Sequence, residues 1–500
     1  MRDLVGADAD NLVAMVLPRG ESKKLETKRV SGKMVHKALE TICAFTNTDG
    51  GMLVLGIEDL DKAKGSARLF GIEENLDAVD ELQRKLNTHF VPPLGGIALT
   101  RIACRLRDGS AGHLIALRVA KSDKVHSILD DGTWTRLERG NRSMSATEVV
   151  ELSFKRGERS TEADALPVSV DLLDTAAWRT FASSRGFLSG SVGDRLYRIG
   201  LAKKSGDDLL PTRAAILLFA DEPGALLAAH GSRADIRVFH YRGNQVEHGS
   251  VPNLKKTPKT ISGAIYEQIE RAHNYVLEEL AEGLTLASSG FKTVHRYPER
   301  VIKEAITNAV IHRDYRLNRD IHIRIFDNRI EFESPGLLPG RITPSNIERA
   351  GSFARNPLLA SNLREFPVPP NIDAGEGVRM MFATMRENRL YPPLYLENPD
   401  AAQPTVTLIL WNEERPPVWE QVSDWIDRNG PIANADLCKI ADIDTLKASK
   451  LLKRWVAQGV LVADTTTGKR NRVYRKPSSG TPDGELPLLS EPMDNKTEET

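Results

Sequence analysis

The sequence predicts a multidomain protein of the α+β class. Its 500 residues are more than a single hydrophobic core usually supports. Apolar residues at helical spacing and short apolar runs bounded by turn formers both occur along the chain. A hydrophobic content of 40% and a charged content of 27% are ordinary for a soluble globular protein. We expect domains at 1–157, 165–290, 291–411 and 417–476, followed by a disordered acidic tail at 477–500.

Several function classes are excluded at this level. No apolar run approaches the roughly 18 residues that a transmembrane helix needs, so we expect no membrane partner. The first residues, "MRDLVGADADNLVAM", lack the apolar core of a signal peptide. Cys43, Cys104 and Cys438 are far apart and show no CxxC spacing. These features predict a protein of the reducing cytoplasm, without a structural zinc site.

The charges are distributed unevenly, although the formal net charge is zero. Residues 19–37 contain seven Lys or Arg against two Glu, and residues 445–476 contain nine against one Asp. The tail from 477 holds six acids against one Lys. Two basic segments indicate contact with nucleic acid at two places, or, in the plainer interpretation, two solvated faces.

The first region should contain a helix and several strands. "KMVHKALETICAF" has helical spacing, "NTDGG" stops the helix, and "MLVLGI" follows as a short buried strand. "KKLETK" alternates like a strand, which places Glu26 on one face with Lys24 and Lys28. "GHLIALRVAKS" and "GTWTRLERGN" are predicted as further strands.

Three carboxylates of this region are candidate metal ligands. Glu21 precedes the first strand, Glu26 lies in it, and Asp59 follows "MLVLGI". If the two strands are neighbours, the three acids converge and need a cation such as Mg²⁺ or Mn²⁺. That ion would activate a water, and Lys28 would steady the phosphoryl oxygens. The alternative is that Glu21 and Glu26 only form surface ion pairs with nearby lysines.

The sequence of this region resembles the Schlafen-type AlbA domain over residues 15–155, through the motif "ESKKLETK" followed by "AFTNTDGGMLVLGIED". The resemblance implies an AlbA-like α+β domain that contacts nucleic acid. It also implies that Glu21, Glu26 and Asp59 form the metal site of a nuclease, with Lys28 as a catalytic neighbour. Thr27 stands where the family usually has an aromatic residue.

The region 165–290 is predicted to be a connecting α/β unit. "DTAAWRTFASSRGF" and "SVGDRLYRIGLAKKS" are typical of helices, and "RAAILLFA" and "ADIRVFHYRG" of strands. "TISGAIYEQIERAHNYVLEELAEGL" predicts a long helix with one apolar face.

A polar stripe marks the predicted helix of residues 299–312. Arg300, Glu304, Asn308 and His312 recur every four residues, and Asn is unfavourable inside a helix, so a functional role is indicated. The alternative is a solvated helix face. "DIHIRIF", a "DN" turn and "RIEFE" then predict a hairpin.

Residues 290–411 resemble the ATP-binding fold of the gyrase, chaperone, histidine-kinase and MutL (GHKL) superfamily, an α/β sandwich. The resemblance rests on the Glu304–Asn308 "ExxxN" helix, on "HRDY" at 312–315 and on "GEGVRMM" with Gly375 and Gly377. It implies that Asn308 holds Mg²⁺ on the phosphates of ATP and that Glu304 activates water. Further expected contacts to the nucleotide come from His312, Gly375 and Gly377, with 337–374 as a lid. "ESPG" stands where the superfamily has an Asp before a Gly.

The module at 417–476 resembles a winged helix-turn-helix. Its second helix carries Lys447, Lys450, Lys453 and Arg454 opposite an apolar face, and a basic hairpin tip carries Lys469, Arg470 and Arg472. Such a helix enters the DNA major groove while the wing touches the backbone, although some winged helices dock proteins instead.

Together these features predict an ATP-regulated nucleic-acid-binding protein that acts as a metal-dependent nuclease, with weak ATPase activity as a secondary expectation. The resemblance implies a role in defence against foreign nucleic acid and a homodimer or higher oligomer. The competing hypothesis is a non-enzymatic, ATP-responsive transcription regulator. An ATPase of the P-loop class is disfavoured because GxxxxGK[ST] does not occur.

Overall fold

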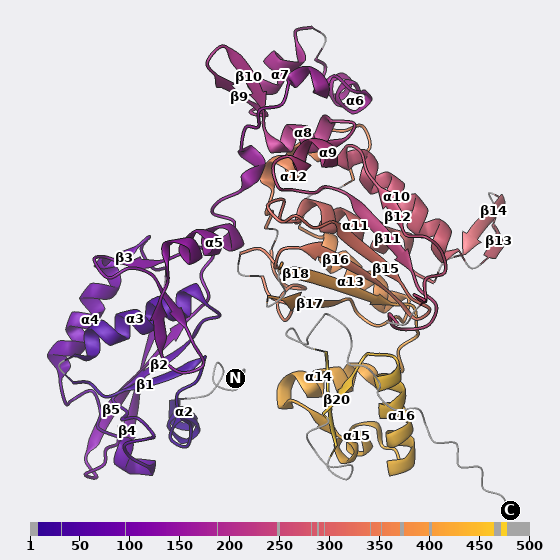
Figure 1. Cartoon of the computed structure of the whole chain (residues 1–500). Helices are drawn as coiled ribbons and strands as arrows, with labels where there is room; N and C mark the ends of the chain where they lie inside the picture. Colours follow the sequence, from indigo (N-terminus) through magenta and orange to yellow (C-terminus); the bar gives the residue numbers. More distant parts are fainter. Residues whose placement is uncertain are drawn as a thin grey trace, which may run out of the picture. The chain divides into compact units, whose positions relative to one another are not determined.

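The structure is a computed structural model, and it divides into two compact units, Met1–Arg159 and Ser160–Thr500 (Figure 1). It describes residues 9–31, 33–95, 97–187, 189–247, 251–281, 283–287, 290–294, 296–340, 342–351, 353–370, 375–399, 403–464 and 472–477. The predicted tail therefore lies almost entirely outside the described residues, as do Lys469 and Arg470 of the predicted wing tip.

The first unit is built on a four-stranded sheet in the order β1-β2-β5-β4. Its strands are β1 (Leu25–Lys28), β2 (Gly51–Leu55), β4 (Ala98–Arg105) and β5 (Ala111–Val119). The helices are α2 (Ala9–Val16), α3 (Met34–Asn47), α4 (Leu76–Thr88) and α5 (Ala146–Arg156). Four shorter strands complete it: β3 (Phe90–Val91), β6 (Ser127–Ile128), β7 (Trp134–Arg136) and β8 (Asn141–Ser143).

Both faces of this sheet are buried, because strand residues alternate between two cores. Leu53 and Leu117 pack with α3 and α4 on one face, whereas Val54 and Leu114 pack with α2 on the other. β1 and β2 are parallel neighbours, with Glu26 opposite Leu53. The two strands are therefore neighbours, which was the condition for the three acids to converge, and the alternation turns Glu26 and Lys28 toward the α3 side.

The second unit contains a six-stranded mixed sheet in the order β12-β11-β15-β16-β18-β17. The strands are β11 (Ile236–His240), β12 (Lys259–Ile261), β15 (Ile321–Ile325), β16 (Arg329–Pro335), β17 (Leu394–Asn398) and β18 (Thr405–Trp411). The core places α10 (Ile265–Leu280), α11 (Glu299–Ile311) and α13 (Gly377–Glu387) on one face of the sheet (Figure 1). The predicted boundary at 290/291 falls inside this fold, because β11 pairs in parallel with β15.

The remaining elements of the second unit lie outside this sheet. Helices come first in the chain: α6 (Ala176–Ser184), α7 (Val192–Arg198), α8 (Arg213–Phe219), α9 (Pro223–Ala228) and later α12 (Pro357–Leu363). Two antiparallel pairs also occur, β9 (Ala202–Ser205) with β10 (Asp208–Pro211), and β13 (Gly283–Ala287) with β14 (Gly290–Val294).

The strand predicted for "RAAILLFA" is wrong, since these residues form α8. Thr212 caps the helix by accepting a hydrogen bond from the Ala215 amide at 3.3 Å. All seven residues of α8 are buried, and all but Arg213 are apolar. A short continuous apolar run has no periodicity, and the sequence pattern alone did not separate a buried helix from a buried strand.

The chain ends in a small module that packs on the second face of the large sheet. It contains α14 (Trp419–Asn429), α15 (Asn434–Ala441) and α16 (Thr445–Ala457), with β19 (Ile432–Ala433), β20 (Val462–Ala463) and β21 (Val473–Arg475) in a three-stranded sheet. Trp419 and Trp455 share a core with Ile409 and Trp411 of β18. None of the helices in the described ranges combines the length and apolarity needed to cross a bilayer.

Candidate functional site

Glu26 is the most deeply buried of the predicted catalytic acids, at 3% exposed. Its Oε1 accepts a hydrogen bond from Lys28 Nζ, and its Oε2 lies 2.7 Å from Arg136 Nη2. Within the described residues Oε2 makes no hydrogen bond, because the guanidinium is close but poorly oriented. A buried carboxylate is thus compensated by two cations of the chain while one oxygen keeps its capacity to accept.

Glu21 and Asp59 lie in the same electrostatic neighbourhood. Burial, together with the negative charges of Glu26 and Asp59, raises the pKa of Glu21 to about 7, against the opposing effect of Lys28 and Arg136. Acids that are remote in sequence therefore influence one another electrostatically. A nearby divalent cation would lower this pKa, since it favours the charged carboxylate.

The three acids do not form a closed ligand set in this conformation. Among the described residues, one group of His, Cys, Asp or Glu side chains brings its ligand atoms within 4.8 Å of one another, and that group is His36, Glu40 and Asp131. These residues lie on α3 and on the turn between β6 and β7.

Two buried arginines hold the region of the acids in place. The sequence pattern did not identify either of them. Arg136 donates hydrogen bonds to the carbonyls of Ser22 at 2.7 Å and Leu25 at 3.2 Å. Arg68 donates to the carbonyls of Leu17 at 2.6 Å and Glu58 at 2.7 Å. Both side chains tie the segments on which Glu21 and Asp59 sit to the rest of the unit.

The second candidate site is a cavity of about 410 Å³ between α11, α13 and the sheet. All five residues predicted to contact the nucleotide line it, namely Glu304, Asn308, His312, Gly375 and Gly377. The predicted lid segment contributes to the lining with Leu337, Leu338 and Phe353. Most of the remaining lining is apolar, as in ligand cavities where a few polar groups fix orientation.

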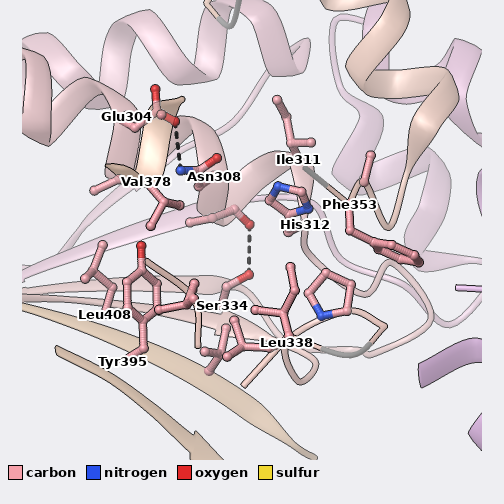
Figure 2. A pocket seen from close by; sticks show the side chains of 18 of the residues that line it. Glu304, Asn308, Ile311, His312, Ser334, Leu338, Phe353, Val378, Tyr395 and Leu408 are labelled. Atoms are coloured by element: carbon pink, nitrogen blue, oxygen red, sulfur yellow. Dashed lines mark hydrogen bonds between the residues drawn. The ribbon is translucent and has the colours of Figure 1, made fainter. Parts of the chain in front are cut away.

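Glu304 and Asn308 form a hydrogen-bonded pair at the polar end of the cavity (Figure 2). Asn308 Nδ2 donates to Glu304 Oε1 at 2.9 Å, as expected for residues four apart on α11. Burial raises the pKa of Glu304, and the bond from Asn308 opposes that shift. A Cβ on Gly377 would lie 1.8 Å from Glu304 Oε1, so the start of α13 approaches this carboxylate closely enough to require glycine.

Ser334 and Tyr395 complete the polar lining from the sheet. Ser334 Oγ, in the "ESPG" stretch, donates to the Ala309 carbonyl at 2.8 Å and so ties this part of β16 to α11 (Figure 2). Tyr395 is 8% exposed, and its hydroxyl, which points into the cavity, makes no hydrogen bond to any described residue. The sequence pattern did not identify Tyr395, because alternation on β17 indicates the face on which a side chain lies but not the cavity or segment next to that face.

Four of the predicted nucleic-acid contacts of the C-terminal module lie on its surface. Four exposed cations, Lys447, Lys450, Lys453 and Arg454, project from α16, whose opposite face is buried through Ala448, Leu452 and Trp455. Arg472 is half-buried beside β21, and β20 and β21 form the predicted antiparallel hairpin.

Comparisons with known families support both resemblances. Residues 21–145 match the family described as Schlafen, AlbA_2, and residues 318–408 match the family described as putative ATP-dependent DNA helicase recG C-terminal, whose model is an ATPase-type domain. The chain therefore combines an AlbA-type Schlafen domain with a GHKL-like ATPase domain, which indicates an ATP-linked, nucleic-acid-related function.

Two further comparisons concern whole chains. No curated protein sequence matches this one. Among solved structures, the DIP2311 protein from Corynebacterium diphtheriae is similar at 19% identity, with a TM-score of 0.39, and the match covers 95% of this chain and 97% of that one.

Proposed function

We propose that the chain is an ATP-regulated nucleic-acid-binding protein that acts as a metal-dependent nuclease. The observation that carries the proposal is the Glu304–Asn308 pair, which lies directly against Gly377 in the lining of a cavity of about 410 Å³. A glutamate whose burial raises its pKa, an amide and glycine backbone at a helix start suit a magnesium-bound triphosphate. The apolar remainder of the cavity lining suits the nucleobase of a bound nucleotide.

Nucleotide binding would act as a switch. Leu337, Leu338 and Phe353 come from the segment predicted as a lid, and they form one wall of the cavity. A ligand that binds the closed arrangement better than the open one shifts the population toward it. Ser334 is engaged with Ala309, so recognition of the base would rest on other groups, with Tyr395 as the buried hydroxyl that remains to be paired.

The nuclease part of the proposal rests on Glu21, Glu26 and Asp59. Their chemistry fits a hard divalent cation, since all are carboxylates, they influence one another, and Glu26 Oε2 makes no hydrogen bond within the described residues. Glu21, Glu26 and Asp59 would hold Mg²⁺ or Mn²⁺, which when bound supplies an acidified water and charge stabilisation at a phosphate. Lys28, paired with Glu26, would steady the phosphoryl oxygens.

The experiment uses the purified chain with labelled RNA, single-stranded DNA and duplex DNA, in Mn²⁺ or EDTA, with and without ATP. We expect metal-dependent cleavage that Glu26→Gln reduces at least about 100-fold, the cost typical of removing a group that stabilises transition-state charge. Glu151→Gln, an exposed substitution on α5, serves as the control. If Glu26→Gln cleaved nucleic acid as fast as the wild type, the proposed role of the acids in cleavage would be excluded.

A second candidate function is a non-enzymatic, ATP-responsive transcription regulator. The specific observation in its favour is the exposed basic face of α16 within a module whose helices and small sheet have the order of a winged helix. In that case no cleavage occurs, and duplex binding changes with ATP. For either function we propose action in the cytoplasm as a homodimer or higher oligomer, and a role in defence for the nuclease.

A further inference from the structure

One cluster of potential metal ligands in the first unit is not part of the predicted site. His36 and Glu40 lie one turn apart on α3, so their side chains project from the same helix face. Asp131 reaches them from the tight turn between β6 and β7, about 90 residues further along the chain. His36 Nε2 lies 3.2 Å from Glu40 Oε1 and 3.8 Å from Asp131 Oδ1.

These separations match those between ligands around one metal ion. With metal–ligand bonds of about 2.1 Å, two ligands of a tetrahedral site are about 3.4 Å apart. The two measured distances lie on either side of that value, and all three ligand atoms fall within 4.8 Å of one another. Three protein ligands with an exposed histidine leave a further position for water, the arrangement of an open metal site.

The two carboxylate oxygens of Asp131 have separate roles. Trp134 Nε1 donates to Oδ2 at 3.1 Å, while Oδ1 faces His36. An outer hydrogen bond of this kind would orient the Asp131 carboxylate as a ligand.

We propose that His36, Glu40 and Asp131 form a site for a divalent transition metal of the zinc class, separate from Glu21, Glu26 and Asp59. Imidazole favours zinc, cobalt or nickel over magnesium or calcium, so the cation differs in class from that proposed for the three acids. The ion joins α3 to the β6–β7 turn. It therefore fixes the helix that borders β1, whose Lys28 influences both Glu40 and Glu21.

The test is metal titration of the full chain after chelator treatment. Calorimetry with Zn²⁺, and visible absorption with Co²⁺ as a spectroscopic probe, should both report a site with an imidazole ligand. His36→Ala should weaken Zn²⁺ binding at least 10-fold and remove the cobalt spectrum. Added Zn²⁺ should raise the melting temperature of the wild type and leave that of His36→Ala unchanged, because only the former binds it.

The chain offers a matched control in His113, which lies 2.9 Å from Glu73 in an exposed pair. His113→Ala should leave the zinc affinity unchanged, and so should Glu21→Gln, which alters the proposed nuclease site. His36→Gln provides a second variant that keeps a polar side chain, in case the alanine form is unstable. Zinc binding by His36→Gln equal to that of the wild type, or a wild type without zinc binding, would overturn the proposal whether or not the nuclease proposal holds.

Discussion

Glu26 in the first unit and Glu304 in the second are both largely buried glutamates. Glu26 was predicted to hold a metal ion and Glu304 to activate a water, and the surroundings of the two carboxylates differ. Glu26 is compensated by Lys28 and Arg136. Glu304 has the amide of Asn308 as its partner, no ion pair with any described residue, and a cavity beside it. The charge of Glu26 is compensated by cations of the chain itself, so this carboxylate needs no ligand to be stable when buried. A buried carboxylate beside a cavity, such as Glu304, is stabilised most by a ligand that brings a cation, as a magnesium-bound nucleotide does.

The largest expected effect is on stability and tests whether Glu26 depends on its cations. Arg136→Met should destabilise the first unit by about 3–5 kcal/mol, because it leaves the Glu26 carboxylate buried with one cation fewer. Hydrogen exchange of the β1 amides at increasing urea would measure the change locally. Arg142→Met, which breaks a surface pair with Glu148, is the control and should have little effect. A loss below about 1 kcal/mol for Arg136→Met would show that Glu26 does not need this cation.

The next effect concerns the cavity. Tyr395→Phe should weaken nucleotide binding by about 5- to 10-fold, the value of one hydrogen bond, and leave the melting temperature of the free protein equal or higher. The reason is that the hydroxyl lacks a hydrogen bond within the described part of the chain until a ligand supplies one.

Tyr391→Phe is the matched control for this prediction. The Tyr391 hydroxyl accepts from Trp455 Nε1 at 3.0 Å and lies outside the cavity lining. Its removal should lower the melting temperature without changing nucleotide affinity. Identical affinities for the wild type and Tyr395→Phe, measured by calorimetry, would exclude Tyr395 from recognition.

A pH effect follows from Glu21. Because its pKa in the folded chain is about 7, above the ordinary value of 4.5, the folded state binds a proton more tightly than the unfolded state. The resulting stability is fully present below about pH 4.5 and is lost as pH rises through 7. Glu21→Gln should flatten the decline in melting temperature of the first unit between pH 5 and 8. A decline of the same steepness in both proteins would assign it to another group.

The smallest expected effect is at α16. Lys453→Ala should reduce the slope of log affinity against log salt by about one for duplex DNA, with a modest loss of affinity. Glu420→Gln on α14 is an exposed control at the same module. A slope equal to that of the wild type would indicate that this face of α16 does not contact phosphate.

The sequence predicted those features that depend on local periodicity. The helix period alone places Glu304 and Asn308 together, and strand alternation turns Glu26 and Lys28 to one face. Arg136 and Tyr395 were not found, because their roles depend on which distant segment each side chain meets. Asp131 was missed for the same reason, although His36 and Glu40 have a visible spacing of four.

The ambiguous cases have a physical cause as well. The fully buried run 213–219 has no polar face, so neither period is visible in it, and helix α8 was mistaken for a strand. The sheet that spans the predicted boundary at 290/291 is formed by pairing between β11 and β15, which no local pattern encodes.

The most direct test of the central claim is the affinity of the chain for labelled nucleic acid, measured by fluorescence anisotropy with and without Mg-ATP under conditions that prevent cleavage. We predict that Mg-ATP changes the affinity of the wild type for nucleic acid and has no effect on that of Asn308→Ala, which loses the amide that lines the cavity. If the wild type binds nucleic acid equally well with and without Mg-ATP, or if Asn308→Ala responds as the wild type does, the cavity does not regulate nucleic-acid binding.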